Sequence, residues 1–125
     1  MDRGAADGRG RATGGESPVG PDGRSAASLA ALFAAVAADL EGVERRGGTG
    51  EAEYLRAGRP FAAAAGRVGL FLLRPDVARA ALRTPDTAPS ARGPGWVAFA
   101  PADLDPYAAD RAEAWFRSAW RLAGE

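Results

Sequence analysis

The chain lacks several residue types on which common enzymes depend. It has 125 residues with no cysteine and no histidine, and its 16 basic residues are all arginine, so lysine is missing as well. These absences exclude a Ser-His-Asp triad, a thiol nucleophile, a zinc finger and a histidine metal site from this chain. Without lysine there is also no Schiff-base chemistry and no phosphate-binding loop of the GxxxxGK type. We therefore expect a protein that is not an enzyme and that needs no cofactor.

Other absences bear on the cell compartment and the net charge. Without cysteine no disulfide can form, which fits the cytoplasm. The first ten residues, MDRGAADGRG, contain no apolar segment of the kind that forms a signal peptide. The longest apolar run, SLAALFAAVAADL, is too short and too amphipathic to span a bilayer. Acidic and basic residues balance at 16 each, so no overall field directs the chain to nucleic acid or to a membrane. These features predict a soluble, cytoplasmic protein.

The first 24 residues differ in composition from the rest of the chain. They are rich in glycine, contain no aromatic residue and, after the initial methionine, hold Val19 as their one large apolar side chain. Burial of so few apolar groups cannot offset the conformational entropy that is lost on folding. We therefore expect residues 1–24 to be a disordered tail and residues 25–125 to form a single domain.

Hydrophobic periodicity in residues 25–125 predicts three helices and about four strands. Apolar side chains at helical steps, such as Leu29 and Phe33, predict a first helix that begins near Ser25 or Ser28 and ends at Gly42. The charged stretch ERRGGTG, residues 44–50, is expected to be a loop. The later elements are expected to be strands over 51–58, 60–66 and 67–74, a short helix over 75–84, a strand over 96–100 and a helix over 107–123. The fold class is therefore α+β, in the order α-β-β-β-α-β-α, with a mainly antiparallel sheet packed against helices.

The closing helix carries a cluster of aromatic side chains, Trp115, Phe116 and Trp120. Such a cluster could serve as a platform on which nucleobases stack. Aromatic side chains on one helix face more commonly seal a sheet, because each of them removes a large apolar area from water. We interpret this cluster as part of the core.

The loop over residues 84–95, TPDTAPSARGPG, is the best candidate for a binding site. It is longer than the roughly two to six residues that usually connect a helix to a strand. The tryptophan that follows, Trp96, is assigned to the late strand and to the core, because alternation continues from it through Phe99. With the preceding helix, the loop could present one basic face to phosphates or a carboxylate. The candidate ligand-binding residues are Arg74, Arg79, Arg83, Thr87, Ser90 and Arg92.

Acidic residues provide two weaker candidates. Asp103, Asp105 and Asp110 resemble a cation-binding loop, but their spacing does not match an EF-hand, and acidic residues are favoured at a helix N-terminus in any case. A carboxylate pair such as Glu51 and Glu53 would need a pocket to act in acid–base catalysis, and the sequence indicates none. We therefore expect neither a metal site nor catalytic residues.

Several short motifs resemble those of the MmcQ/YjbR family. They are DLEGVER at the end of the first helix, RAGRPFAAAAGR across a hairpin, LFLLRPDVARAAL from strand into helix, GPGWVAF in the late strand and AWFRSAWRLA in the closing helix. The resemblance covers roughly residues 28–123, and the TfoX N-terminal domain shares the same order of features. It implies a small bacterial protein with a CyaY-like α+β fold, described as DNA-binding, and no established reaction or cofactor.

The resemblance extends to single positions. Phe61 and Ala62 correspond to the family's central Phe-Ala, and Trp96 corresponds to the tryptophan that opens its late strand. We predict a non-enzymatic cytoplasmic module that binds DNA or another anionic ligand through the arginine-bearing helix and loop. The alternative is a protein–protein interaction domain, or a scaffold domain that forms homodimers. No membrane partner is expected.

Overall fold

The computed structural model describes residues 24–47 and 51–125, and these residues form three helices and six strands. The elements are α1 (Arg24–Ala38), β2 (Val43–Arg46), β3 (Glu51–Arg56), β4 (Arg59–Ala65), β5 (Val68–Leu72), α2 (Pro75–Ala81), β6 (Thr87–Pro89), β7 (Trp96–Phe99) and α3 (Pro106–Ala123). The α+β class is confirmed. The predicted tail over residues 1–24 lies outside the described residues, apart from Arg24, with which α1 begins.

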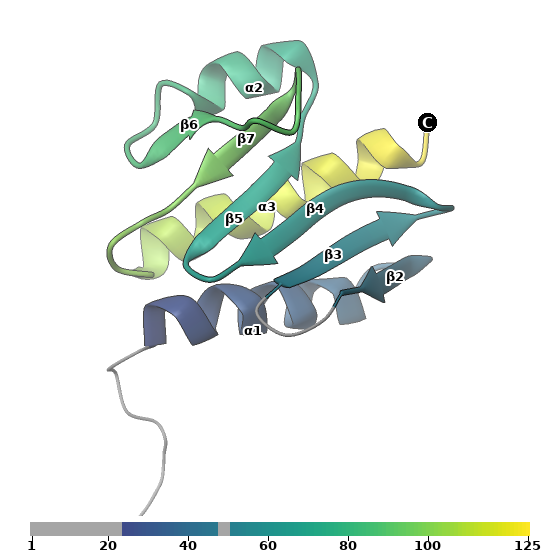
Figure 1. The fold of residues 1–125 in the computed structure, drawn as a ribbon, viewed down its shortest axis with the longest axis horizontal. Helices are drawn as coiled ribbons and strands as arrows, with labels where there is room; N and C mark the ends of the chain where they lie inside the picture. The colour runs from purple at the N-terminus through teal and green to yellow at the C-terminus, as the bar shows by residue number, and fades with distance from the viewer. Residues whose placement is uncertain (1–23, 48–50) are drawn as a thin grey trace, which may run out of the picture.

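All six strands form one antiparallel sheet in the order β2-β3-β4-β5-β7-β6. Figure 1 shows β2 and β6 at its two edges. The prediction of about four strands in the order α-β-β-β-α-β-α was therefore wrong, because the order in the described residues is α-β-β-β-β-α-β-β-α. The four strands that were predicted form the interior of the sheet.

The two strands that the sequence did not predict are the two edge strands. In β2, with the sequence VERR, only Val43 is even half-buried, and in β6 the half-buried Thr87 is followed by the exposed Ala88 and Pro89. An edge strand pairs on one side only and buries little, so it tolerates charged residues and proline that a central strand excludes. Both strands therefore lack the apolar alternation that identifies a strand in a sequence.

β4 contains one residue more than its partner strand β3. Tyr54 pairs with Ala62 and Leu55 pairs with Pro60, which leaves Phe61 without a partner in the register. An extra residue of this kind bends the strand and turns successive side chains away from strict alternation. Phe61 and Ala62 are both fully buried in the core, and Pro60 is left beside Leu55 on the opposite face of the sheet.

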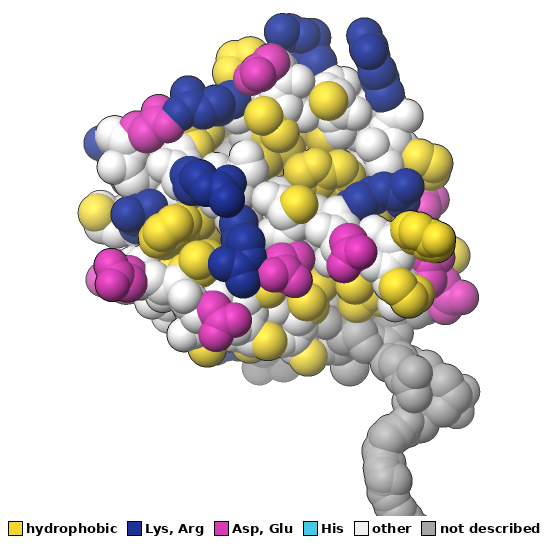
Figure 2. All heavy atoms as spheres, turned by 180° about the vertical axis from the view of Figure 1, so that it is seen from behind, with side chains coloured by type: hydrophobic (Ala, Val, Ile, Leu, Met, Phe, Trp, Pro, Cys, Tyr) yellow, Lys and Arg dark blue, Asp and Glu magenta, His cyan; other side chains and the backbone are white. Residues whose placement is uncertain are grey.

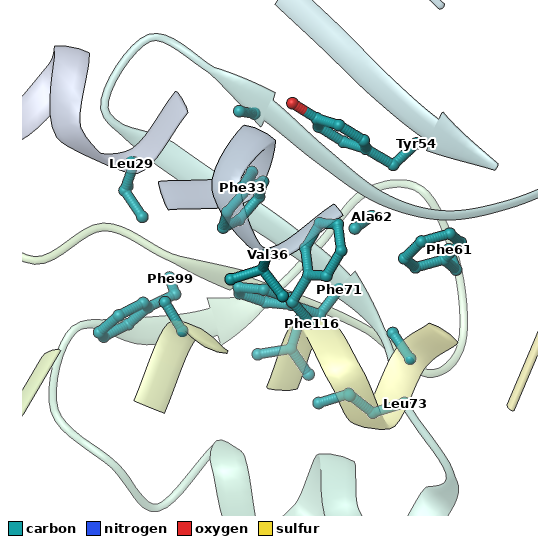
Figure 3. Packing of buried hydrophobic residues seen from close by; sticks show 14 of the residues in the cluster. Leu29, Phe33, Val36, Tyr54, Phe61, Ala62, Phe71, Leu73, Phe99 and Phe116 are labelled. Carbon is teal, nitrogen blue, oxygen red and sulfur yellow. The ribbon is translucent and has the colours of Figure 1, made fainter. Parts of the chain in front are cut away.

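The core lies between the sheet and the helices α1 and α3, and Phe33 of α1 is at its centre (Figure 3). Its ring centroid lies 5.1 Å from that of Phe116 in α3, 5.3 Å from that of Phe71 in β5 and 6.0 Å from that of Tyr54 in β3. These rings meet in tilted or edge-to-face arrangements, which aromatic pairs favour over face-to-face stacking. The cluster therefore holds both helices against one face of the sheet.

The tryptophans of α3 seal the margin of this core, as the sequence predicted. Trp115 and Trp120 are half-buried and pack against the core cluster. The Trp115 ring meets Phe99 of β7 edge-on at 5.1 Å, and the Trp120 indole donates a hydrogen bond of 2.8 Å to the carbonyl of Glu41. The Arg56 guanidinium covers the Trp120 ring at 3.9 Å. These contacts occupy both indoles within the fold.

Helix α2 covers the part of the same face that α3 leaves open. Its inward residues Ala78 and Ala81 belong to the core cluster, and it contacts β7. At the start of α3, the Asp105 side chain accepts a hydrogen bond of 2.8 Å from the backbone N–H of Ala108, which is the helix-capping role expected for an acidic residue there. The three described helices therefore share one face of the sheet.

Candidate functional site

The face of the sheet that points away from the helices is the candidate binding surface, and we call it the open face. One row of paired residues crosses it, from Glu53 in β3 through Ala63, Leu70 and Ala98 to Ala88 in β6. Ala63 is fully buried, although it does not belong to the core cluster on the helical side. Side chains on the open face must therefore cover part of the sheet themselves.

Arg92, from the loop between β6 and β7, reaches across this face. Its guanidinium donates a hydrogen bond of 2.9 Å to Glu53 Oε2 and a longer one of 3.5 Å to Glu51 Oε2, both in β3. The same guanidinium lies over the ring of Trp96 at 4.8 Å from the ring centroid. The planar guanidinium is suited to this combination, because it can donate in its plane while it rests on an aromatic ring.

The loop that carries Arg92 is held in a defined shape. The backbone N–H of Ser90 donates to the carbonyl of Trp96 at 3.0 Å, and the Ser90 hydroxyl oxygen accepts from the N–H of Arg92 at 3.1 Å. Gly95 has φ of +83°, a backbone conformation that would be strained in a residue with a side chain. Its carbonyl accepts a hydrogen bond of 2.9 Å from the N–H of Leu73. These bonds tie both ends of the loop to the sheet and fix where Arg92 leaves it.

Glu53 connects this loop to the far edge of the sheet. Its Oε1 accepts a hydrogen bond of 2.7 Å from Arg46 in β2, while its Oε2 accepts from Arg92. The bonds from Arg46 and Arg92 lower the pKa of Glu53 below its ordinary value of 4.5, and burial opposes them. Glu53 is therefore a carboxylate held in its ionised form between two guanidiniums.

A shallow cavity of about 570 Å³, wide open to solvent, lies beside Arg92, where the β3–β4 turn, the end of β5 and the loop meet. It is lined by Gly58, Arg59, Pro60, Leu72, Arg92 and Trp96. Three of these residues offer apolar surface, two are cations, and none of the described lining residues is acidic. A volume of this size suits a small organic molecule.

Arg59 is fixed on its side of the cavity by the end of α3. Its Nη1 donates to the main-chain oxygen of Glu125, the last residue of the sequence, at 2.8 Å and to the carbonyl of Ala123 at 3.3 Å. Carbonyl groups at a helix C-terminus attract cations, so this contact is electrostatically favourable. Arg59 therefore lines the cavity while its guanidinium is bound to the end of α3.

The other predicted site residues do not join Arg92 in one basic face. Arg74 pairs with Glu125, whereas Arg79 in α2 and Arg83 in the turn after it are exposed and form no ion pair within the described part of the chain. Because α2 packs on the helical side of the sheet, these arginines belong to a different surface from Arg92. On the side opposite to that of Figure 1, Figure 2 shows arginines interspersed with acidic side chains rather than gathered into a block.

The two predicted hydroxyl donors are used inside the fold. Thr87 Oγ1 lies 2.8 Å from the carbonyl of Thr84 and 3.0 Å from that of Ala81, where it joins β6 to the end of α2. Ser90 supports the loop, as described above. Of the six predicted residues, the cavity therefore takes in Arg92 alone.

The remaining cavity residues were not predicted as site residues. Trp96 was assigned to the core, and this was wrong: it is half-buried on the open face, while its neighbours Val97 and Phe99 fill the core. The alternation of side chains along the strand correctly predicts that Trp96 lies on the opposite face of the sheet from Val97 and Phe99. Arg59 and Pro60 reach the cavity through the irregular register at Phe61, for which the sequence carries no clear signal.

Other kinds of site receive no support from the described residues. Within residues 24–47 and 51–125, no group of acidic residues is arranged to hold a metal ion. In the same residues, no helix is long and apolar enough to cross a membrane. Comparison with protein-family models, with curated proteins and with solved structures gave no match. The resemblance to the MmcQ/YjbR family therefore stays a prediction.

Proposed function

We propose that this protein is a non-catalytic module that binds an anionic ligand on the open face of its sheet, in the cavity beside Arg92. The observation that carries this proposal is Arg92, a positioned cation on the wall of a cavity that Arg59 also lines and whose described lining includes no carboxylate. Arginine binds carboxylates and phosphates through paired N–H groups, and the bonds are stronger than those between neutral partners.

The proposal places the binding site on the loop and not on α2. Arg79 and Arg83 are exposed and do not line the cavity, and solvated arginines on or beside a short helix are common on protein surfaces. Arg92, by contrast, is held by Glu53 and Trp96 before any ligand arrives. A preorganised side chain loses less conformational entropy on binding, which favours affinity.

The proposal also favours a small anion over DNA. A duplex is bound through many phosphate contacts along an extended basic surface. Arg92 has Glu51 and Glu53 as immediate neighbours, and the α2 arginines lie on the other side of the sheet. A compact ligand in the cavity needs Arg92 and its immediate surroundings, and no extended basic surface.

A non-catalytic role is consistent with where the remaining reactive groups lie. Glu53 is paired with two arginines, Tyr54 is buried in the core, and Tyr107 is exposed on the surface. None of these three residues lines the cavity. The groups that do line it can bind and orient a ligand, but they include no base or nucleophile of ordinary strength.

Calorimetric titration tests this proposal. We expect the wild-type chain at low salt to bind inorganic phosphate or benzoate, and the substitution Arg92→Ala to weaken that binding about tenfold, because a charge-assisted hydrogen bond is lost. Arg79→Ala removes the same charge from an exposed site and should leave the affinity unchanged. A short DNA duplex serves as the third probe.

Two results would overturn the proposal. One is that none of the three probes binds the wild-type chain at low salt. The other is that binding is lost in Arg79→Ala combined with Arg83→Ala but kept in Arg92→Ala, which would move the site to α2.

The alternative, association of two copies through the open face, has one observation in its favour. Leu70, Leu72 and Ala98 are half-buried there, and none of the described helices covers them. Light scattering distinguishes the two functions, because this alternative requires a dimer at micromolar concentration. A monomer would exclude it and leave the cavity open to a small ligand.

A further inference from the structure

The lining of the cavity is divided into an apolar part and a cationic part. Pro60, Leu72 and Trp96 form the apolar part, and Arg59 and Arg92 form the cationic part. We infer that the ligand is a flat aromatic carboxylate, whose ring lies against the apolar residues while its single negative charge meets Arg92. This inference rests on the proposed function and specifies the ligand class for the same site.

The apolar part requires a ligand that is more than a bare anion. Pro60, Leu72 and Trp96 are each half-buried, so each still exposes apolar surface to water. Covering that surface is favourable in proportion to the area removed from water. Inorganic phosphate would leave this apolar surface exposed to water, whereas an aromatic ring would cover it.

The bound position of Arg92 favours a flat group. Its guanidinium already lies over the Trp96 ring, and its two hydrogen bonds to other described residues use two of its five N–H donors. Within the described part of the chain, the other three are available to a ligand. A carboxylate in the plane of the guanidinium can accept two of these in parallel. A ring conjugated to that carboxylate is coplanar with it and can extend along the apolar residues.

The charges around Arg92 favour a ligand with one negative charge. Arg46 and Arg92 are balanced by Glu51 and Glu53, to which they are hydrogen bonded, and Arg59, whose guanidinium is bound to the end of α3, is the other cation that lines the cavity. A dianion such as a phosphate monoester would meet the same cations but would be repelled more strongly by the two carboxylates. The geometry therefore selects a carboxylate over a phosphate.

The test is a titration of the full-length chain with four probes that separate these features. The probes are 2-naphthoate, the neutral 2-naphthalenemethanol, the non-planar cyclohexanecarboxylate and the dianionic 2-naphthyl phosphate. We expect 2-naphthoate to bind about tenfold or more tightly than the neutral and the non-planar probe, because each of them lacks one of the two interactions. We expect 2-naphthyl phosphate to bind more weakly than 2-naphthoate.

Paired variants show whether the contacts are those named here. Arg92→Ala should weaken 2-naphthoate about tenfold, and Leu72→Ala should weaken it severalfold with less effect on cyclohexanecarboxylate. Their matched controls are Arg79→Ala and Leu82→Ala, which make the same changes at exposed positions outside the cavity. Circular dichroism confirms that each variant is folded.

The outcomes separate this inference from the proposed function. If inorganic phosphate binds through Arg92 as tightly as 2-naphthoate, or if the non-planar or the phosphate probe equals 2-naphthoate, the inferred ligand class is wrong while anion binding stands. If the neutral probe equals 2-naphthoate, the negative charge contributes nothing to binding, and both are wrong. If no probe depends on Arg92, both are wrong. If the controls weaken 2-naphthoate as much as Arg92→Ala and Leu72→Ala do, the ligand binds elsewhere, and both are wrong as well.

Discussion

The Arg92 guanidinium donates a hydrogen bond of 2.9 Å to Glu53 Oε2 across 39 positions of sequence. This bond connects the loop before β7 to β3, although β4 and β5 lie between β3 and β7 in the sheet. It places a cation on the open face of the sheet, whereas the described helices all pack against the opposite face. The candidate site therefore depends on a long-range contact as much as on the loop itself.

The substitution Glu53→Gln should lower the free energy of unfolding by about 0.5–1 kcal/mol at neutral pH. The side chain of Glu53 is only 20 % exposed and accepts bonds from Arg46 and Arg92, so the loss of its charge weakens two contacts at once. Urea denaturation at pH 7 measures the difference. Glu51→Gln is the control, because Glu51 is 56 % exposed and its one bond to Arg92 is 3.5 Å long, so its effect should be smaller.

The contribution of Glu53 to stability should also depend on pH in a defined direction. The arginines lower the pKa of Glu53 in the folded chain below 4.5, so its stabilising effect is present above about pH 4.5 and is lost as the pH falls through the folded pKa. The stability gap between wild type and Glu53→Gln should therefore narrow as the pH is lowered below 4.5. A gap that stays constant or widens toward low pH would contradict this assignment.

Gly95→Ala should destabilise the chain by about 2–3 kcal/mol. The residue has φ of +83°, and a Cβ there would lie 3.0 Å from the carbonyl oxygen of Leu73 and 3.2 Å from Leu72 Cδ1. Gly58→Ala separates the two causes, because Gly58 has a similar φ of +78° but nothing within 4 Å of such a Cβ. We expect about 1 kcal/mol for Gly58→Ala. Equal effects in thermal denaturation would show that crowding at Gly95 is unimportant.

Phe33→Ala should cost about 3–5 kcal/mol, the range for a large aromatic side chain removed from a core. Phe33 contacts the rings of Phe71 and Phe116 and joins α1 to both the sheet and α3. Where this variant does not fold, Phe33→Leu keeps most of the volume and should lose about 1–1.5 kcal/mol. Leu82→Ala, on the exposed end of α2, should change stability by less than about 0.5 kcal/mol in the same denaturation experiment. A Phe33 variant as stable as wild type would contradict the central place of this residue.

The sequence predicted those parts of the fold whose signal is local. Apolar alternation identified the four interior strands, and helical spacing identified the closing helix around Phe116. The edge strands β2 and β6 were missed because their stability comes from a neighbouring strand and not from their own apolar residues. Trp96 was correctly assigned to the late strand and to the face opposite Val97 and Phe99, but it was wrongly assigned to the core. Alternation alone does not indicate which face of a sheet the helices will cover.

The candidate site was predictable only in part for a similar reason. Arg92 stood out because it lies in a long loop rich in glycine and proline. Its partners Glu51 and Glu53, and the cavity residues Arg59 and Leu72, come from strands that only the folded sheet brings near the loop. No spacing within the chain relates these residues to one another.

The most direct test of the central claim is a ¹H–¹⁵N correlation spectrum of the labelled full-length chain during titration with 2-naphthoate. If the ligand binds on the open face beside Arg92, the Trp96 indole N–H, the Gly58 and Gly95 amides and the Arg92 side chain should shift together and saturate, while the amides of α2 stay in place. Shifts confined to α2, or no saturable shift at millimolar 2-naphthoate, would contradict the claim.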